Sequence, residues 1–387
     1  MAIKGFKAAA VAANLRYKDR PDLGLIVSDG PAAWAGVFTQ SVCQAAPVIW
    51  SRPLANKGRG RAILANSGQA NAQTGREGDA NCLRSAELIG AALGCPPEEI
   101  MLASTGIIGQ QVNMPALAEA VPGLAAALSP GGLDDFARAI MTTDTFAKTA
   151  ASECACDGGT VSVWGCAKGS GMIAPNMATM LGFVLTDANI APELLRGIIR
   201  EGADMSFNRV TVDGDTSTND CLMLMASGAA LVTGGPALEA FKTAVFTVMR
   251  NLARQIAKDG EGATKLVTVR LRGAASPEEA LLAARTVAES PLVKTAFFGG
   301  DANWGRVFMA LGRSGARFDP YAVNMDLDDV PWVRNGIDNG REEAASAVMQ
   351  KTEYVLDINL NAGTSGCEML TCDFSHEYVS INGDYRS

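Results

Sequence analysis

Histidine is almost absent from this sequence. His376 is the single histidine among 387 residues, and it stands near the end of the chain. A histidine-rich zinc site is therefore excluded, and Cys154 and Cys156 lack the second cysteine pair that a zinc ribbon needs. A Ser-His-Asp or Cys-His arrangement would have to use His376. If the protein is an enzyme with a side-chain nucleophile, we expect a base other than histidine.

Positive charge and long apolar runs are also scarce. The formal net charge of −8 and the pI near 4.9 argue against a nucleic-acid partner, which requires a basic face. No apolar run reaches the roughly 18 residues of a membrane span. The opening Met1–Lys7 lacks the apolar region of a secretory signal. Nine scattered cysteines, an odd number, predict reduced thiols. We therefore expect a cytoplasmic protein with no membrane partner.

Strand-like and helix-like segments alternate along the chain. Strands are expected at residues 23–27, 34–39, 47–50, 61–65, 99–104, 160–166, 179–185, 222–226, 266–271, 295–298, 306–311, 321–326 and 353–360. Helices are expected at residues 79–93, 115–128, 132–141, 192–201, 236–258, 277–289 and 339–351. This interleaving predicts an α/β (α+β) fold with layered packing, and the length suggests two domains.

The stretch Lys168–Asp187 changes character in its middle. Its glycine-rich first part cannot form regular structure, whereas Thr179–Leu185 is a short apolar run typical of a buried strand. Cleavage of the bond between Ala178 and Thr179 would leave the Thr179 hydroxyl beside its own α-amine. Such an amine has a pKa of roughly 7.7–8.0, close to that of a general base at neutral pH. Threonine is also simply common at strand starts, and chemistry alone does not separate the two interpretations.

Other polar segments have weaker signals. Gly169–Gly171 is followed by Pro-Asn and a strand rather than a helix, which argues against a dinucleotide site. Asp213–Asp220 lacks the central glycine and closing glutamate of a calcium loop, so it is a solvated turn or lines a polar pocket. Thr105 and Gly106 could supply oxyanion donors, and Glu261 could be a solvated loop carboxylate. No metal site is expected.

Seven motifs together strongly resemble those of the ornithine acetyltransferase (glutamate N-acetyltransferase) family of arginine biosynthesis. In chain order they are Asn66–Gly75, Ser104–Gly109, Met141–Thr145, Lys168–Leu181, Asp213–Asp220, Asp259–Lys265 and Gly300–Arg306. The resemblance runs from about residue 5 to Tyr378–Ser387. The sequence departs from the usual motifs at Gln69, Gln73 and Ala147, and it is only loosely similar over Cys367–Asp373.

The resemblance implies a precursor that cleaves itself before Thr179, giving an α chain of residues 1–178 and a β chain of residues 179–387. It implies Thr179 as nucleophile and Thr105 with Gly106 as oxyanion hole. The implied substrate contacts are Thr142, Lys168, Thr179, Glu261, Asn382 and Ser387. Glu261 would either hold the substrate ammonium group or tune the Thr179 amine.

The resemblance also implies an αββα-type sandwich of mixed sheets with a smaller C-terminal α/β domain at about residues 275–387. Two copies of each chain would assemble. The expected activity is acyl transfer from N-acetylornithine to glutamate without a cofactor, and acetyl-CoA is open as a second acetyl donor. The alternatives are a self-processing amidase or aminopeptidase, whose acyl-threonine is taken by water, and an uncleaved binding protein.

Overall fold

The computed structural model describes residues 2–156, 159–174, 180–232 and 234–384. The chain divides into two compact units. The described residues within 2–208 and 215–256 form unit 1, and those within 209–214 and 257–384 form unit 2. Each unit has its own mixed sheet and is described separately.

Unit 1 is built on an eight-stranded mixed sheet in which β2 is the longest strand and joins two halves. The pairing of β2 with β3 is irregular between Val27 and Ala32. On its other edge β2 pairs with β1 along its first half and with β9 along its second half. The path order is β4-β3-β2-β9-β7-β6-β5. The strands are β1 (Phe6–Val11), β2 (Leu23–Phe38), β3 (Arg59–Gln69), β4 (Ile100–Ile107), β5 (Lys148–Cys156), β6 (Gly159–Lys168), β7 (Leu181–Asn189) and β9 (Cys221–Leu231).

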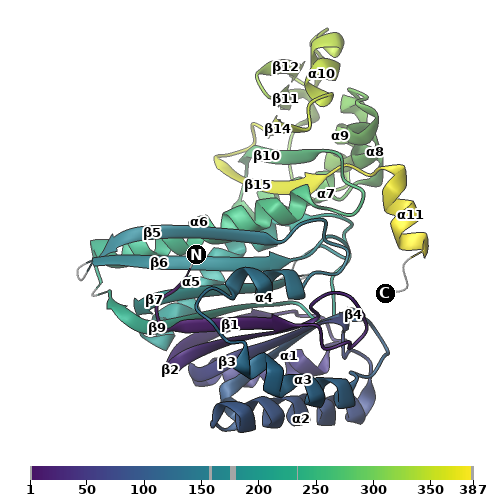
Figure 1. The fold of residues 1–387 in the computed structure, drawn as a ribbon. Helices are drawn as coiled ribbons and strands as arrows, with labels where there is room; N and C mark the ends of the chain where they lie inside the picture. Colours follow the sequence, from purple (N-terminus) through teal and green to yellow (C-terminus); the bar gives the residue numbers. More distant parts are fainter. Residues whose placement is uncertain (1, 157–158, 175–179, 233, 385–387) are drawn as a thin grey trace. The chain divides into compact units, whose positions relative to one another are not determined.

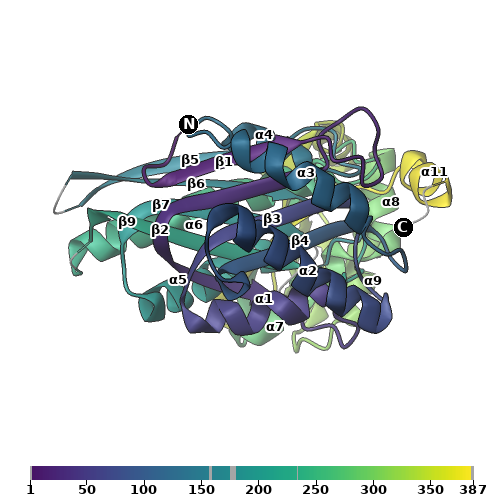
Figure 2. The same ribbon diagram turned by 60° about the horizontal axis from the view of Figure 1, so that its bottom comes forward.

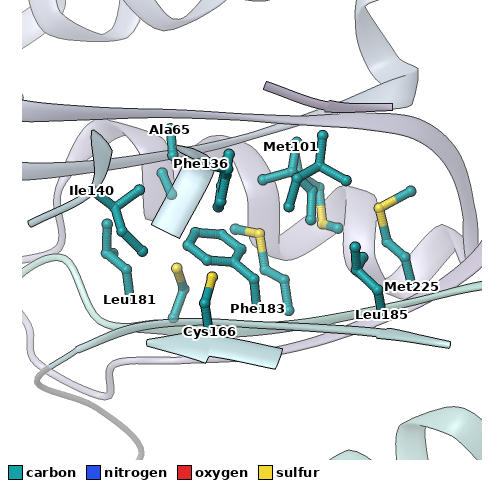
Figure 3. Packing of buried hydrophobic residues seen from close by; sticks show 14 of the residues in the cluster. Ala65, Met101, Phe136, Ile140, Cys166, Leu181, Phe183, Leu185 and Met225 are labelled. Atoms are coloured by element: carbon teal, nitrogen blue, oxygen red, sulfur yellow. The ribbon is translucent and has the colours of Figure 1, made fainter. Parts of the chain in front are cut away.

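The two halves of this sheet face each other across a buried core, as Figure 3 shows. Ala65 and Met101 come from the β1–β4 half, and Cys166 comes from the other half. Phe136 fills the middle, with its ring edge on to Phe183 at a centroid distance of 5.1 Å. Such edge-on aromatic pairs are favoured over face-to-face stacking. The two halves therefore form the two inner layers of a sandwich.

Helices cover both outer faces of unit 1. Helices α1, α2 and α3 lie against the β1–β4 half (Figures 1 and 2), where a second buried cluster includes Leu64, Leu102 and Leu117. Helix α6 packs closely against β6. Gly165 of β6 allows this approach, since a Cβ there would lie 2.9 Å from Val248 of α6. The helices and 3₁₀ turns are α1 (Ala46–Lys57), α2 (Gly75–Leu93), η1 (Pro97–Glu99), α3 (Met114–Ala126), α4 (Leu133–Ala139), α5 (Pro192–Met205), η2 (Phe207–Arg209) and α6 (Pro236–Lys258).

Unit 2 contains a seven-stranded mixed sheet in the order β13-β12-β11-β14-β10-β15-β8. Its core joins the sheet to helices α7 to α10 through residues such as Val269, Val287 and Leu311. The strands are β8 (Val210–Thr211), β10 (Leu266–Ala274), β11 (Asn324–Leu327), β12 (Val330–Arg334), β13 (Ile337–Asp338), β14 (Glu353–Asn359) and β15 (Ser365–Cys372). The helices and the 3₁₀ turn are α7 (Pro277–Ala288), α8 (Pro291–Gly299), α9 (Trp304–Gly312), η3 (Pro320–Ala322), α10 (Glu342–Met349) and α11 (His376–Asp384).

The predicted α/β (α+β) class with layered sheets is confirmed, but three predicted strands are wrong. Residues 47–50 lie in α1, residues 295–298 in α8 and residues 306–311 in α9. Short apolar runs do not distinguish strands from buried helix turns by periodicity alone. Proline opens α1 and α8, where its missing N–H costs nothing, and the Asn303 side chain caps α9. Unit 2 also includes β10 as an inner strand, upstream of the expected domain start near residue 275.

Candidate functional site

Thr105 and Gly106 lie near the end of β4, the edge strand that runs parallel to β3. Gly106 has a φ of 126°, a conformation that residues with a Cβ rarely adopt. A Cβ at this position would stand 2.2 Å from the carbonyl carbon of Gly68, its partner in β3. Close approach of two backbones therefore requires glycine here. The positive φ of the main chain directly after Thr105 is therefore possible here because residue 106 is glycine.

Lys168 ends β6 and reaches the same place. Its side chain is buried, and its Nζ donates a hydrogen bond to Thr105 Oγ1 at 3.2 Å. The two residues are 63 positions apart in the sequence. The structure thus brings together one expected oxyanion residue and one expected substrate contact, with a positive charge beside the β4 end.

Asp144 joins the segment of Thr142 to the end of β6. Its Oδ1 accepts hydrogen bonds from Lys148 Nζ at 2.6 Å and from the Gly169 amide at 2.7 Å, and its Oδ2 accepts one from the Thr142 amide at 3.0 Å. Burial alone would raise the pKa of Asp144. The charges of Lys168 and Lys148 and the bonds from Lys148 and Gly169 outweigh burial and lower the pKa to about 2. Asp144 is therefore a carboxylate near neutral pH.

The start of β7 is held from both sides. Lys168 pairs with Leu181 across the ladder, and the Cys221 amide of β9 donates to the Met180 carbonyl at 3.0 Å. Asp220 is buried beside this point. Burial raises the pKa of Asp220 well above its ordinary value, and the Met180 N–H and the Lys168 charge offset this only in part. Ala178 and Thr179 precede Met180 in the chain and lie outside the described residues.

The polar segment Asp213–Asp220 contributes a clamp through Asn219. The Asn219 Nδ2 donates to the carbonyls of Ala70 at 2.6 Å and Ser104 at 2.8 Å. The Ser104 hydroxyl in turn donates to Asn66 Oδ1 at 2.6 Å. Asn219 thus fixes the peptide that carries Thr105. The sequence left this segment as either a solvated turn or the lining of a polar pocket. Its last two residues, Asn219 and Asp220, are buried, and Asn219 belongs to a polar network.

In unit 2, Glu261 and Asn382 meet. Glu261 follows α6 and is buried, and its Oε2 accepts a hydrogen bond from Asn382 Nδ2 of α11 at 2.9 Å. The same Nδ2 donates to the Tyr378 carbonyl one helical turn earlier. The two expected substrate contacts, 121 positions apart, therefore form a direct pair within this unit.

The loop that carries Glu261 is anchored on both sides. Gly262 has a φ of 68°, and a Cβ there would lie 2.5 Å from the Tyr378 amide. Asp373 accepts hydrogen bonds from the Thr264 amide at 2.8 Å, the Thr264 hydroxyl at 2.6 Å and the Lys265 amide at 2.9 Å. Charge-assisted bonds of this kind are about twice as strong as neutral ones. The anchoring places the Glu261 carboxylate rather than leaving it on a free loop.

The sequence pattern of the ArgJ family matches residues 7–387. The chain belongs to the ArgJ family. The protein of Desulfotalea psychrophila named arginine biosynthesis bifunctional protein ArgJ is 47% identical over 393 aligned positions, which cover 100% of both chains. The protein of the same name from Nitratidesulfovibrio vulgaris is 49% identical and covers 99% of each. The chain also resembles the crystal structure of the arginine biosynthesis bifunctional protein ArgJ of Bacillus halodurans, with a TM-score of 0.52 and 40% sequence identity. The match covers 54% of this chain and 100% of that chain.

Membership confirms the resemblance that the seven motifs indicated. The predicted site residues that the structure describes form two groups. One joins Thr105, Gly106, Thr142 and Lys168 in unit 1, and the other joins Glu261 and Asn382 in unit 2. Ala178, Thr179 and Ser387 lie outside the described residues, so their predicted roles stay predictions.

Sequence reasoning missed Asp144, Asn219 and Asp220 as parts of the site. Each stands inside one of the seven motifs, and an aspartate four positions before Lys148 was the available sequence signal for Asp144. Asn219 and Asp220 gave no such signal, because an Asp- and Thr-rich stretch is also typical of an exposed turn. Among the described residues, no cluster of three or more His, Cys, Asp or Glu side chains is arranged to hold a metal ion. In the same part of the chain, no helix has the length and apolarity that a membrane crossing requires.

Proposed function

We propose that this ArgJ-family protein is an acyltransferase of arginine biosynthesis that moves acetyl from N2-acetylornithine to glutamate. The observation that carries the proposal is the buried Lys168 beside Thr105 and Gly106 at the end of β4. This group offers hydroxyl and backbone donors for an oxyanion and a cation for a substrate carboxylate. Relatives that align with the whole chain are named arginine biosynthesis bifunctional proteins, which supports the pathway.

The first step of the proposal is self-cleavage. Thr179 Oγ attacks the carbonyl carbon of Ala178, the peptide C–N bond breaks, and the Thr179 nitrogen takes the proton. Water then hydrolyses the resulting ester, which leaves a carboxylate on Ala178 and a free α-amine on Thr179. That amine becomes the base for its own hydroxyl, as in other N-terminal threonine nucleophiles.

Turnover then follows a double displacement. The Thr179 amine takes the hydroxyl proton while Oγ attacks the acetyl carbon of N-acetylornithine. The proton passes to the leaving nitrogen, and ornithine departs. Glutamate attacks the acetyl ester with its amine and leaves as N-acetylglutamate, which restores the Thr179 hydroxyl. Negative charge develops on the acetyl oxygen in both halves, and one oxyanion donor such as Thr105 or Gly106 is worth about 2.7–4 kcal/mol.

The remaining predicted contacts suit the two amino-acid substrates. The Lys168 ammonium group is a compact positive charge that can pair with the α-carboxylate of an amino-acid substrate. Thr142, Asn382 and Ser387 supply polar contacts in this scheme. The Glu261 carboxylate, held by Asn382, suits the ammonium group of an amino-acid side chain or the Thr179 amine. Residues of both the α chain and the β chain are needed, so the two chains must stay together after cleavage. As the motif resemblance implies, we propose that two copies of each chain assemble in the cytoplasm.

We extend the proposal to acetyl-CoA as a second acetyl donor, because whole-length relatives are named bifunctional. The same ester on Thr179 would form, with the CoA thiol as leaving group, and glutamate would again accept the acetyl group. Steady-state release of free thiol that requires glutamate and is lost in Thr179→Ala would support this extension. Absence of that release in an enzyme active with N-acetylornithine would reject it.

The test of the proposal begins with the intact mass of the purified recombinant protein. Two species of 178 and 209 residues (387 − 178), the second starting at Thr179, are expected, and Thr179→Ala should give one uncut chain. Acetyl transfer from N-acetylornithine to glutamate is then followed by chromatography. An uncut wild-type chain without transfer would contradict the proposal and favour a binding protein. Acetate release that ignores added glutamate would favour the amidase or aminopeptidase alternative.

A further inference from the structure

The pair of Asp144 and Lys148 is unusual because both side chains have no exposed surface. Removing two charges from water is expensive, and apolar residues of similar size are often at least as stable in such positions. A fully buried pair therefore needs a reason beyond stability. The Lys148 ammonium group also lies 5.1 Å from the Phe146 ring centroid, so aromatic surface as well as carboxylate surrounds this cation.

Asp144 connects the two substrate contacts of unit 1 through their backbones. Its Oδ2 holds the Thr142 amide at 3.0 Å, and its Oδ1 holds the amide of Gly169, the residue after Lys168, at 2.7 Å. One carboxylate thus bridges two main-chain segments beyond the point where the β5–β6 ladder ends at the pair of Lys148 and Ala167. Moving either segment would move Thr142 relative to Lys168.

We propose that Asp144 is a positioning residue that fixes Thr142 and Lys168 at the separation an amino-acid substrate requires, with Lys148 as the cation that keeps its carboxylate charged. The proposal rests on the proposed function, which names Thr142 and Lys168 as substrate contacts. Three amide or ammonium donors converge on two carboxylate oxygens. An asparagine offers one acceptor oxygen and an NH₂ group, so it would confront at least one of these donors with another donor.

The alternative is that the pair only holds the fold together. The double variant Asp144→Asn/Lys148→Met separates the two roles, because it removes both members of the fully buried pair and leaves neither of them as an unpaired ion. We expect this variant to fold and process itself, with KM for N-acetylornithine and for glutamate raised on the order of 10- to 100-fold and kcat changed far less. Lys148→Arg, which keeps the cation, should retain KM near that of the wild type.

The matched control is Asp135→Asn, which breaks an exposed 2.8 Å pair with Arg138 and should leave both constants unchanged. A double variant with a wild-type melting temperature and wild-type KM would overturn the inference. If the double variant does not fold, Asp144→Glu decides, since it keeps the charge and displaces it by one methylene. A folded Glu variant with raised KM supports positioning, and one with wild-type KM overturns it. Wild-type processing and transfer are measured first, so that failure of the proposed function is recognised separately.

Discussion

Acid should destabilise unit 1 through Asp144 by an amount that follows from its surroundings. The folded-state pKa of Asp144 is lowered from 3.8 to about 2, because Lys168, Lys148 and the two donors at its Oδ1 outweigh the effect of burial. A carboxyl group with a depressed folded pKa contributes stability above its unfolded pKa and loses it as pH falls toward the folded pKa. The loss should therefore run from about pH 4 down to about pH 2.

The magnitude comes from the size of this shift. Each pKa unit corresponds to about 1.4 kcal/mol, so the shift of Asp144 is worth about 2 kcal/mol at neutral pH. By pH 3 about half of that contribution should be gone, because Asp144 is then largely protonated in the unfolded chain and still largely ionised in the folded one. The full contribution of about 2 kcal/mol exceeds that of an exposed ion pair, which is typically worth about 0.2–1 kcal/mol.

Urea unfolding at pH 6 and pH 3 measures the loss. Thr179→Ala keeps the chain continuous, and replacing Trp304 and Trp332 of unit 2 by Phe leaves tryptophan fluorescence as a reporter of unit 1. The same protein carrying Asp144→Asn/Lys148→Met cannot titrate at this position. Between the two pH values, the free energy of unfolding should fall by about 1 kcal/mol more in the protein that keeps Asp144.

An exposed carboxylate provides the control for this measurement. Asp135→Asn, which breaks the surface pair with Arg138, should change the pH dependence by less than about 0.5 kcal/mol. Parallel curves with and without the pair of Asp144 and Lys148 would refute the reasoning. They would mean that the carboxyl group titrates normally and that the buried lysine does not hold it ionised.

Three further predictions concern the two groups of site residues. Gly106→Ala should lower the melting temperature far more than Gly109→Ala, because a Cβ meets the neighbouring backbone only at Gly106; equal losses would show that positive φ alone sets the cost. Glu261→Gln should retain the hydrogen bond from Asn382 and should still fold and cleave itself, but it should lose most acetyl transfer because the carboxylate charge is gone. Full steady-state activity in this variant would show that the charge of Glu261 is not needed. Asp220→Asn should melt near the wild-type temperature below about pH 4 and increasingly above it as pH rises, because burial raises the folded pKa of Asp220 and the wild type alone then loses stability as its unfolded carboxyl group ionises; thermal scans in which Asp220→Asn lowers the melting temperature at neutral pH as much as Asp220→Ala does would contradict this reasoning.

Much of the fold could be predicted from local patterns, and the failures have a common cause. Helix α6 was predicted with its observed bounds, because a long amphipathic pattern after a proline has few alternatives. The segments 295–298 and 306–311 failed because a buried helix turn and a buried strand are equally apolar over a few residues. The expected strands at 23–27 and 34–39 are parts of the single strand β2, whose continuity depends on pairing with β1, β3 and β9.

The sequence by itself determined the family, the motif set and the residue types of the chemistry. A lone histidine excluded a histidine-rich zinc site and limited any histidine base to His376, and seven motifs in order indicated the family that the comparisons confirm. These conclusions need only composition and order along the chain, which a sequence states directly.

Only the tertiary structure decided which polar residues act together. Lys168 reaches Thr105 across 63 positions, Glu261 reaches Asn382 across 121, and Asn219 reaches Ser104 across 115. The sequence also could not separate Asp144, a buried ionised carboxylate, from Asp220, a buried acid with a raised pKa. The difference depends on how many cations and N–H donors surround each oxygen, and packing between distant segments alone sets that number.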